Sequence, residues 1–185
     1  MLNLSKGANT SLTASRPALQ RILVAIGWGV PATMTADLDL SVLLCGSDGR
    51  VPHDSYVVFA DQLTDTPAPA APAPAATAVD DEQVEVDLAA VPGYVHRIVF
   101  AGAIYQAESR RQTFGQLVQP YIRVADLDTG DDLVRYTLEH DCAGETALAF
   151  GELYRHSSGW KFRAIGQGWS NGLAGLTRDY GAGGR

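Results

Sequence analysis

The chain has 185 residues, 46% of them hydrophobic, with a formal net charge of −7 and a pI of about 4.9. This length and composition predict a single globular domain, residues 1–185, with a sizeable core. The acidic balance argues against nucleic acid or an anionic membrane surface as the main partner.

The N-terminal part of the chain is rich in strand patterns. Residues 2–13 alternate in polarity, and the apolar run at 21–28 predicts a strand that is covered on both faces or lies in a sandwich core. A loop then leads to an acidic strand at 37–45. Turn chemistry at 46–49 predicts a hairpin between that strand and the β-branched and aromatic run at 56–59.

The acidic strand alternates carboxylates with leucines, so its two faces differ. Successive side chains of a strand point to opposite faces, and those on one face are roughly 6–7 Å apart. Carboxylates that close repel unless a cation lies between them, and calcium prefers such oxygen ligands. The alternative is an acidic strand face exposed to water. The polar face comprises Asp37, Asp39 and Ser41, and the apolar face comprises Leu38, Leu40 and Val42.

Residues 66–78 are an alternation of proline and alanine with four prolines. Proline cannot donate to a sheet ladder, and this repetition favours extended polyproline II over helix. We interpret the segment as an exposed loop inserted into the domain, because neither flank has a complete set of strands. A role as a proline-rich ligand of another protein is the alternative.

The rest of the chain again reads as short strands separated by turns, without the βαβ rhythm of a parallel sheet. These features predict a mainly β fold, an antiparallel β-sandwich with one or two short helices. Strands are expected at 83–88, 94–105, 120–126, 133–138, 147–155 and 160–166, and short helices within 107–116 and at 173–176.

No catalytic motif is present. The chain lacks a nucleophile elbow, a phosphate-binding glycine loop and a dinucleotide fingerprint, and its four histidines are scattered. Cys45 and Cys142 have no metal-ligand neighbourhood, and we expect both to be buried thiols in a reducing cytoplasm. We also expect no signal peptide and no membrane span. The sequence therefore predicts a non-enzymatic cytoplasmic protein; acid–base catalysis by paired carboxylates is a weaker alternative, since nothing supplies a pocket.

Acidic residues recur on both sides of the proline-rich insert. If the strands meet at one edge of the sandwich, their carboxylates converge, and a cation would offset the repulsion. The alternative is that these groups splay into water, where the repulsion is weak. The candidate metal ligands are Asp37, Asp39, Asp61, Asp80, Asp81 and Glu82.

The order of motifs along nearly the whole chain resembles the tellurium-resistance TerD family. The second half carries the most specific motifs. The matching stretches are Leu4–Asn9, Gly27-Trp28, Asp37–Leu40, the strand that ends at Phe59, Asp80–Glu82, Val86–Leu88, Arg111–Gln116, Glu145–Ala147, Phe150–Arg155, Trp160–Gly168 and Asp179–Gly181.

This resemblance implies a β-sandwich, a cytoplasmic role in resistance to tellurite and other chemical stress, no established catalysis, and calcium sites built from acidic loops. The chain departs from the family pattern where those ligands are expected. Gly29 follows the tryptophan, Ser41 replaces an acid, Asp61-Gln62 replaces a pair of asparagines, and the proline-rich insert takes the place of a ligand loop. We therefore expect one weak calcium site or none.

The resemblance also implies a class of partner, namely other stress-response proteins. The second hypothesis is an interaction scaffold that works without metal. In that case either the acidic edge or the proline-rich loop would bind another protein.

Overall fold

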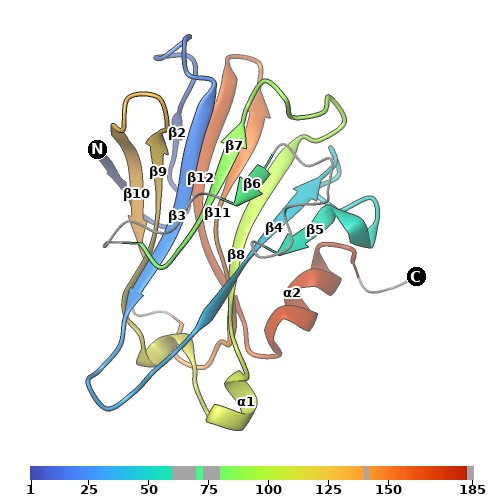
Figure 1. The fold of residues 1–185 in the computed structure, drawn as a ribbon. Helices are drawn as coiled ribbons and strands as arrows, with labels where there is room; N and C mark the ends of the chain where they lie inside the picture. Colours follow the sequence, from blue (N-terminus) through green and yellow to red (C-terminus); the bar gives the residue numbers. More distant parts are fainter. Residues whose placement is uncertain (60–69, 73–79, 140–141, 183–185) are drawn as a thin grey trace.

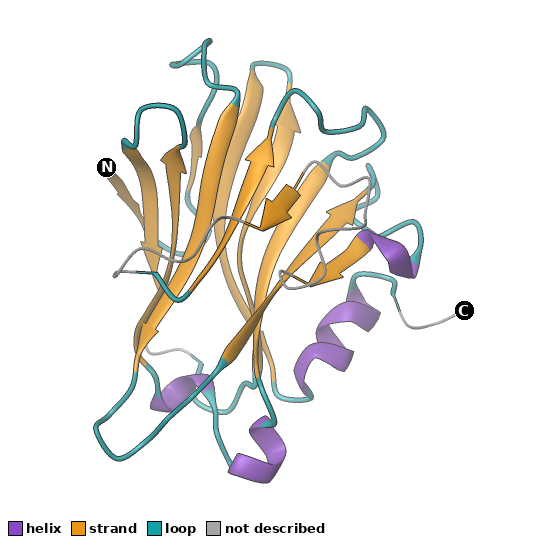
Figure 2. Cartoon of the chain, in the orientation of Figure 1, coloured by secondary structure: helices purple, strands orange, loops and turns teal. Residues whose placement is uncertain are grey.

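The computed structural model describes residues 1–59, 70–72, 80–139 and 142–182. Within these residues the strands form two six-stranded sheets that face each other (Figures 1 and 2). Sheet A has the order β1 (Leu2–Leu4), β10 (Asp132–Thr137), β9 (Val118–Asp126), β3 (Arg21–Gly29), β7 (Glu82–Asp87), β6 (Ala70–Pro72). Sheet B has the order β2 (Asn9–Ser11), β12 (Gly159–Trp169), β11 (Ala147–His156), β8 (Arg97–Ile104), β4 (Leu38–Cys45), β5 (Val57–Phe59).

The predicted mainly β fold with short helices is confirmed. The helices are α1 (Ala107–Arg110), α2 (Gly172–Asp179) and the 3-10 turns η1 (Asp54–Tyr56) and η3 (Phe114–Gln116). The expected hairpins β9–β10 and β11–β12 form, and β4 pairs with β5. One strand pair differs from the antiparallel expectation, because β1 runs parallel to β10.

The main core lies between the two sheets. Alternate residues of β3, such as Ile22, Val24 and Ile26, are fully buried there. The apolar face of the acidic strand also enters this core, as predicted, with Leu38, Leu40, Val42 and Leu44. Each buried aliphatic side chain contributes roughly 1.5–3 kcal/mol, so this layer supplies most of the driving force for folding.

A second core covers the outer face of sheet B, where α2 packs beside β8 and β11 (Figure 1). Small side chains on those strands let the helix approach closely, and Leu176 of α2 is fully buried among them. Trp169 closes one side by donating from Nε1 to Asp179 at 2.8 Å. The alanines under the helix are Ala101, Ala103, Ala147 and Ala149.

The polar face of the acidic strand is therefore only partly open. Asp39 is exposed, whereas Ser41, Leu43 and Cys45 on the same face are buried. Asp37 precedes β4 and is not part of it. The strand was expected to expose two carboxylates and a hydroxyl on one face. Within β4 only the Asp39 carboxylate is exposed on that face, because the second core covers the rest of it.

The proline-rich insert is described only at residues 70–72. These residues form β6, which pairs with β7 at the edge of sheet A. At these three positions the structure has a short edge strand in place of the expected polyproline II backbone. An edge strand tolerates Pro72, because proline lacks only the N–H, and an edge leaves one side of the backbone without a ladder. The remainder of the insert lies outside the described residues.

No helix in the described part of the chain combines the length and the apolar character that crossing a bilayer requires. The helices pack on the sandwich instead. Both cysteines are buried free thiols, as predicted: Cys45 lies in the second core, and Cys142 lies at one end of the main core.

Burial in the second core raises the pKa values of two groups. The pKa of the Cys45 thiol rises from 9.0 to about 12, first because of desolvation and then because of the nearby Glu152 carboxylate. The pKa of Tyr180 rises from 10.0 to about 12 for the same two reasons. Both groups bind their protons more tightly in the folded chain. Their contribution to stability is complete below pH 9 and is lost as the pH rises toward 12.

We predict that replacing Cys45 by alanine removes the part of the alkaline loss of stability that begins near pH 9. The free energy of unfolding of the parent chain should fall from pH 9 upward by up to about 1.4 kcal/mol per pH unit for each group. In Cys45→Ala the free energy of unfolding should begin to fall only near pH 10. The difference in free energy of unfolding between the parent chain and Cys45→Ala should therefore become smaller as the pH rises above 9. Urea unfolding at pH 8, 9, 10 and 10.5 measures this.

Val99→Ala is the matched control, since Val99 is buried in the same core and does not titrate. Its destabilisation should stay constant over this pH range. A Cys45→Ala destabilisation that is equally constant would contradict the prediction.

Candidate functional site

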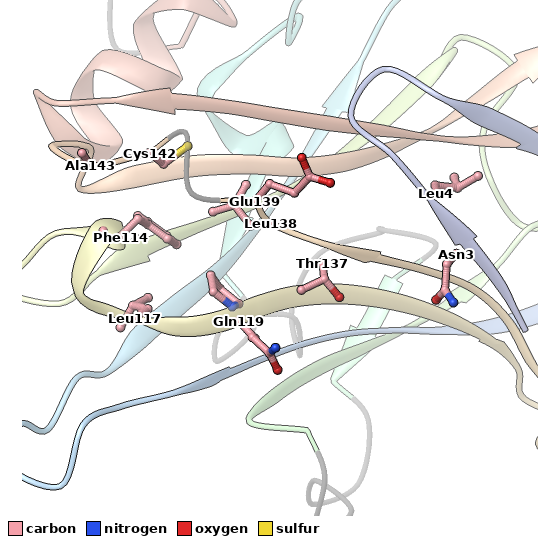
Figure 3. Close-up of a pocket in the computed structure, with 12 residues that line it drawn as sticks. Asn3, Leu4, Phe114, Leu117, Gln119, Thr137, Leu138, Glu139, Cys142 and Ala143 are labelled. Atoms are coloured by element: carbon pink, nitrogen blue, oxygen red, sulfur yellow. The ribbon is translucent and has the colours of Figure 1, made fainter.

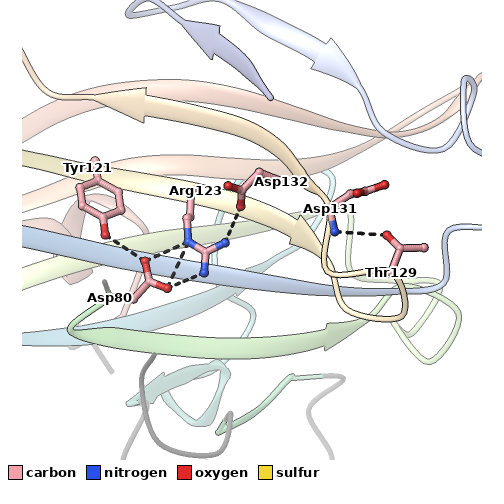
Figure 4. Close-up of polar contacts among 6 residues, drawn as sticks. All are labelled: Asp80, Tyr121, Arg123, Thr129, Asp131 and Asp132. Atoms are coloured by element: carbon pink, nitrogen blue, oxygen red, sulfur yellow. Dashed lines mark hydrogen bonds and ion pairs between the residues drawn. The ribbon is translucent and has the colours of Figure 1, made fainter. Parts of the chain in front are cut away.

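The carboxylate of Asp80 is buried on the outer face of sheet A, with 4% of the residue exposed. Arg123 binds it in a fork: Nε donates to Oδ1 at 2.9 Å and Nη2 donates to Oδ2 at 2.5 Å (Figure 4). The Tyr121 hydroxyl donates to Oδ1 at 2.9 Å. Arg123 also donates from Nη1 to Asp132 at 2.6 Å. Asp80 is thus neutralised by a guanidinium from another strand.

Strand order explains how these residues meet. β3 lies between β7 and β9, and Gly27 of β3 stands opposite Tyr121 of β9. A Cβ at Gly27 would lie 2.4 Å from the tyrosine hydroxyl oxygen, so only glycine leaves room for the ring. Tyr121 can therefore lie across β3 and reach Asp80, which is two residues before the start of β7.

The electrostatics of this network favour a charged arginine and a neutral tyrosine. The hydrogen bond to Asp80 is the main cause that raises the pKa of Arg123 above its usual value, and desolvation opposes it. Burial and the bond to Asp80 raise the pKa of Tyr121 to about 12. The Arg135 guanidinium lies 3.5 Å from the centroid of the Tyr121 ring, in cation–π contact. Asp80 and Arg123 therefore each have a protein partner of opposite charge.

Asp81 and Glu82 continue from Asp80 into β7. The Asp81 carboxylate accepts a hydrogen bond from the Trp28 backbone N–H at 2.9 Å, and its own N–H donates to Ile26 at 3.1 Å. Glu82 is half-buried and pairs with Ile26 in the ladder with β3. Both residues are therefore held at the end of sheet A.

Asp37 and Asp39 lie at the corresponding end of sheet B. Asp37 is 69% exposed in its side chain and accepts a hydrogen bond from Arg110 of α1 at 3.0 Å. Asp39 stands opposite Ala103 of β8 and lines a cavity of about 870 Å³ between α1 and the start of α2. The partners of Asp37 and Asp80 are arginines, so two predicted ligands already have counter-charges.

These positions test whether the described residues fit a calcium ion. In the described ranges, no three acidic, histidine or cysteine side chains lie close enough together to hold a metal. Asp80 directs both oxygens at Arg123, and Asp37 and Asp81 bond to different elements. Asp61 lies outside the described residues. The described donors do not form a calcium site by themselves, and the six-ligand set remains a prediction.

Comparisons with known proteins place this arrangement in a family. Residues 1–180 match the model of the TerD domain. The chain belongs to the TerD family. It is 40% identical over 186 residues to the tellurium resistance protein TerD of Serratia marcescens, covering 97% of each chain. It is 37% identical over 187 residues to general stress protein 16U of Bacillus subtilis, again covering 97% of each.

A solved TerD homologue from Streptomyces coelicolor shares the fold. Its TM-score with this chain is 0.66 at 21% sequence identity, covering 89% of this chain and 99% of that one. The family resemblance expected from the motifs is therefore confirmed, and so is the sandwich.

Sequence reasoning missed Arg123, Tyr121 and Gly27 as members of the site. One signal was present, because Tyr121 and Arg123 are two residues apart in a predicted strand and so share a face. The missing information was that this face meets the acidic start of β7, which depends on the order of strands in sheet A.

We predict that Arg123→Met destabilises this TerD-family chain by roughly 3–5 kcal/mol at neutral pH, because it leaves the buried Asp80 charge without its partner. Adding Asp80→Asn should restore much of that loss, since an amide needs no counter-charge and can still accept from Tyr121. Urea unfolding followed by circular dichroism measures both variants.

Arg16→Met is the matched control, because Arg16 is exposed and its replacement should change stability by less than about 0.5 kcal/mol. If Arg123→Met behaved like this control, the pair would not hold the end of sheet A.

Proposed function

We propose that this chain contributes to resistance against tellurite and other chemical stress as a non-enzymatic cytoplasmic protein whose fold does not require calcium. The observation that supports calcium independence is the Asp80–Arg123 fork, in which an arginine supplies the positive charge that a cation would otherwise provide. The stress role is supported by the full-length similarity to tellurium resistance and general stress proteins.

The non-catalytic part of this proposal has a chemical basis. The charged groups of the Asp80 network are each bonded to another protein group, and burial and Asp80 keep the Tyr121 hydroxyl protonated. A general acid or base must instead be able to exchange a proton with a substrate in reach. The network is suited to holding strands in place.

We also propose that any calcium binding is limited to one weak site. The groups that remain for it are Asp39, Asp81 and Glu82, with Asp61, which precedes the insert in the sequence. Asp39 lies in sheet B, whereas Asp81 and Glu82 lie at the end of sheet A, and the Asp81 carboxylate already accepts from the Trp28 N–H, so a shared ion would have to draw these groups together against that bond. Binding of that kind is weak.

Other stress-response proteins are the proposed partners. The end of the sandwich that carries α1 supports this, because it exposes Asp37 together with Tyr105, which is 46% exposed. The Arg110 guanidinium lies 5.4 Å from the Tyr105 ring centroid and adds a charge of the opposite sign. Tyrosine and arginine are both enriched in protein interfaces, whereas an exposed carboxylate such as Asp37 suits the polar rim.

Calcium independence predicts that the melting temperature changes by less than about 1 °C between 1 mM calcium and excess chelator. A ligand at a hundred times its dissociation constant would stabilise by about 2.7 kcal/mol, which corresponds to several degrees for a chain of this size. Scanning calorimetry in both buffers makes the comparison. A shift of several degrees that Asp39→Asn abolishes would refute calcium independence.

A growth assay tests the stress role separately. Expressed in a tellurite-sensitive bacterial host, the chain should raise the tellurite concentration at which cells grow, in proportion to its abundance. The double variant Asp39→Asn, Asp81→Asn should keep this protection, as should the control Asp131→Asn in the exposed β9–β10 turn. An unprotected host would refute the resistance role. Loss confined to the double variant, with an unchanged melting temperature, would show that a cation is needed.

A further inference from the structure

A cavity of about 580 Å³ lies at the end of the sandwich. It adjoins the Asp80 network, because its lining residue Thr137 pairs with Tyr121 and accepts a hydrogen bond from Arg135. It is bounded by β1, the start of β9, the end of β10, η3 and residues 142–143. Phe114 and Leu117 lie at one end with Cys142, Asn3 and Leu4 lie at the other end, and Thr137 and Glu139 lie between them (Figure 3). Its volume is within the range of small-molecule sites.

One wall of the cavity is held rigidly. A Cβ at Gly115 would lie 2.7 Å from the Ala143 carbonyl oxygen, so glycine allows η3 to touch the 143 backbone directly. The Thr113 hydroxyl donates to the Ala143 carbonyl at 2.9 Å, and the Phe114 N–H donates to Glu145 at 2.8 Å. The apolar end is thus preformed, and a ligand would lose little by ordering it.

The opposite wall contains strained backbone. Gln119 has φ of +48°, in the left-handed region that costs a non-glycine residue roughly 1–2 kcal/mol. The neighbouring Pro120 and Leu138 are tied by a 2.8 Å hydrogen bond between the strands, which fixes this conformation. Strain of this kind persists where the surrounding structure enforces it, and it occurs often at ligand sites.

The lining is divided between apolar and neutral polar groups, with a single charge. Phe114, Leu117 and Leu4 supply apolar surface, and Asn3, Gln119 and Thr137 supply amide and hydroxyl groups. Glu139 is exposed at the rim and is the one charged side chain among the lining residues that the structure describes. The whole chain is also acidic, with a net charge of −7. The Arg135 guanidinium donates from Nε to the Thr137 hydroxyl at 3.5 Å, but it is held against the Tyr121 ring and is not itself a lining residue. Among the described lining residues an anion would meet the Glu139 carboxylate and its repulsion.

We propose that this cavity binds a small organic cation with an apolar body. The apolar part would rest against Phe114 and Leu117, and the positive group would face Glu139 and the neutral polar rim. Charge complementarity with Glu139 selects the cation over an anion of the same shape, and the preformed apolar end adds contact with the exposed edges of the largely buried Phe114 and Leu117.

The test compares benzamidine with benzoate, which have similar size and shape and opposite charge. In the full-length chain labelled with ¹⁵N, benzamidine should shift the amide resonances of Leu117, Gln119 and Thr137 and should bind at least three-fold more tightly than benzoate. Glu139→Gln should weaken benzamidine about three-fold, as expected for an exposed ion pair, and should leave benzoate no weaker. The control Glu108→Gln, an exposed carboxylate on α1, should change neither affinity.

A second variant keeps the proposal open to refutation if Glu139 contributes little. Asn3→Trp places an indole at the mouth from the exposed edge strand β1 and should abolish the benzamidine shifts while the rest of the spectrum is retained. Shifts that survive Asn3→Trp, shifts centred outside this cavity, or equal binding of benzoate would each overturn the proposal.

Discussion

Arg123 and Asp80 meet on the outer face of sheet A, where a guanidinium from β9 reaches across β3 to the carboxylate that precedes β7. A buried ion pair adds little stability over a well-packed apolar pair, but removing one partner is costly. The pair therefore penalises any arrangement in which β7 does not lie beside β3. Gly27 is part of the same constraint, because a larger residue would push Tyr121 off Asp80. The end of the sheet depends on these four residues together.

Local pattern was enough to predict most of the strands. The hairpin from 120 to 138 and the hairpin from 147 to 166 were visible because turn residues separate β-branched and aromatic runs. The two-sided burial of β3 was visible because its apolar run is continuous. Family motifs then gave the fold, and the family model and the solved homologue confirm it.

Features that depend on distant residues could not be predicted in this way. The partner of Asp80 is 43 residues away in sequence, and nothing near Asp80 indicates an arginine. The second core was also hidden, since Ala101, Ala103, Ala147 and Ala149 do not indicate a covering helix until strand order places them under α2. Carboxylates that looked like shared ligands therefore proved to lie on different elements. Their proximity in sequence to β-strand ends said little about their neighbours in space.

The pairing of β1 with β10 has a consequence for how the chain assembles. Leu2 pairs with Val134, and Thr10 in β2 pairs with Phe162, so the first two strands complete opposite sheets by joining some of the last strands made. During synthesis these N-terminal strands must wait without partners while most of the chain emerges. Long-range closure of this kind slows folding, and it leaves sheet edges exposed to neighbouring chains. Newly made chains should therefore be most prone to aggregate before β10 and β12 have emerged.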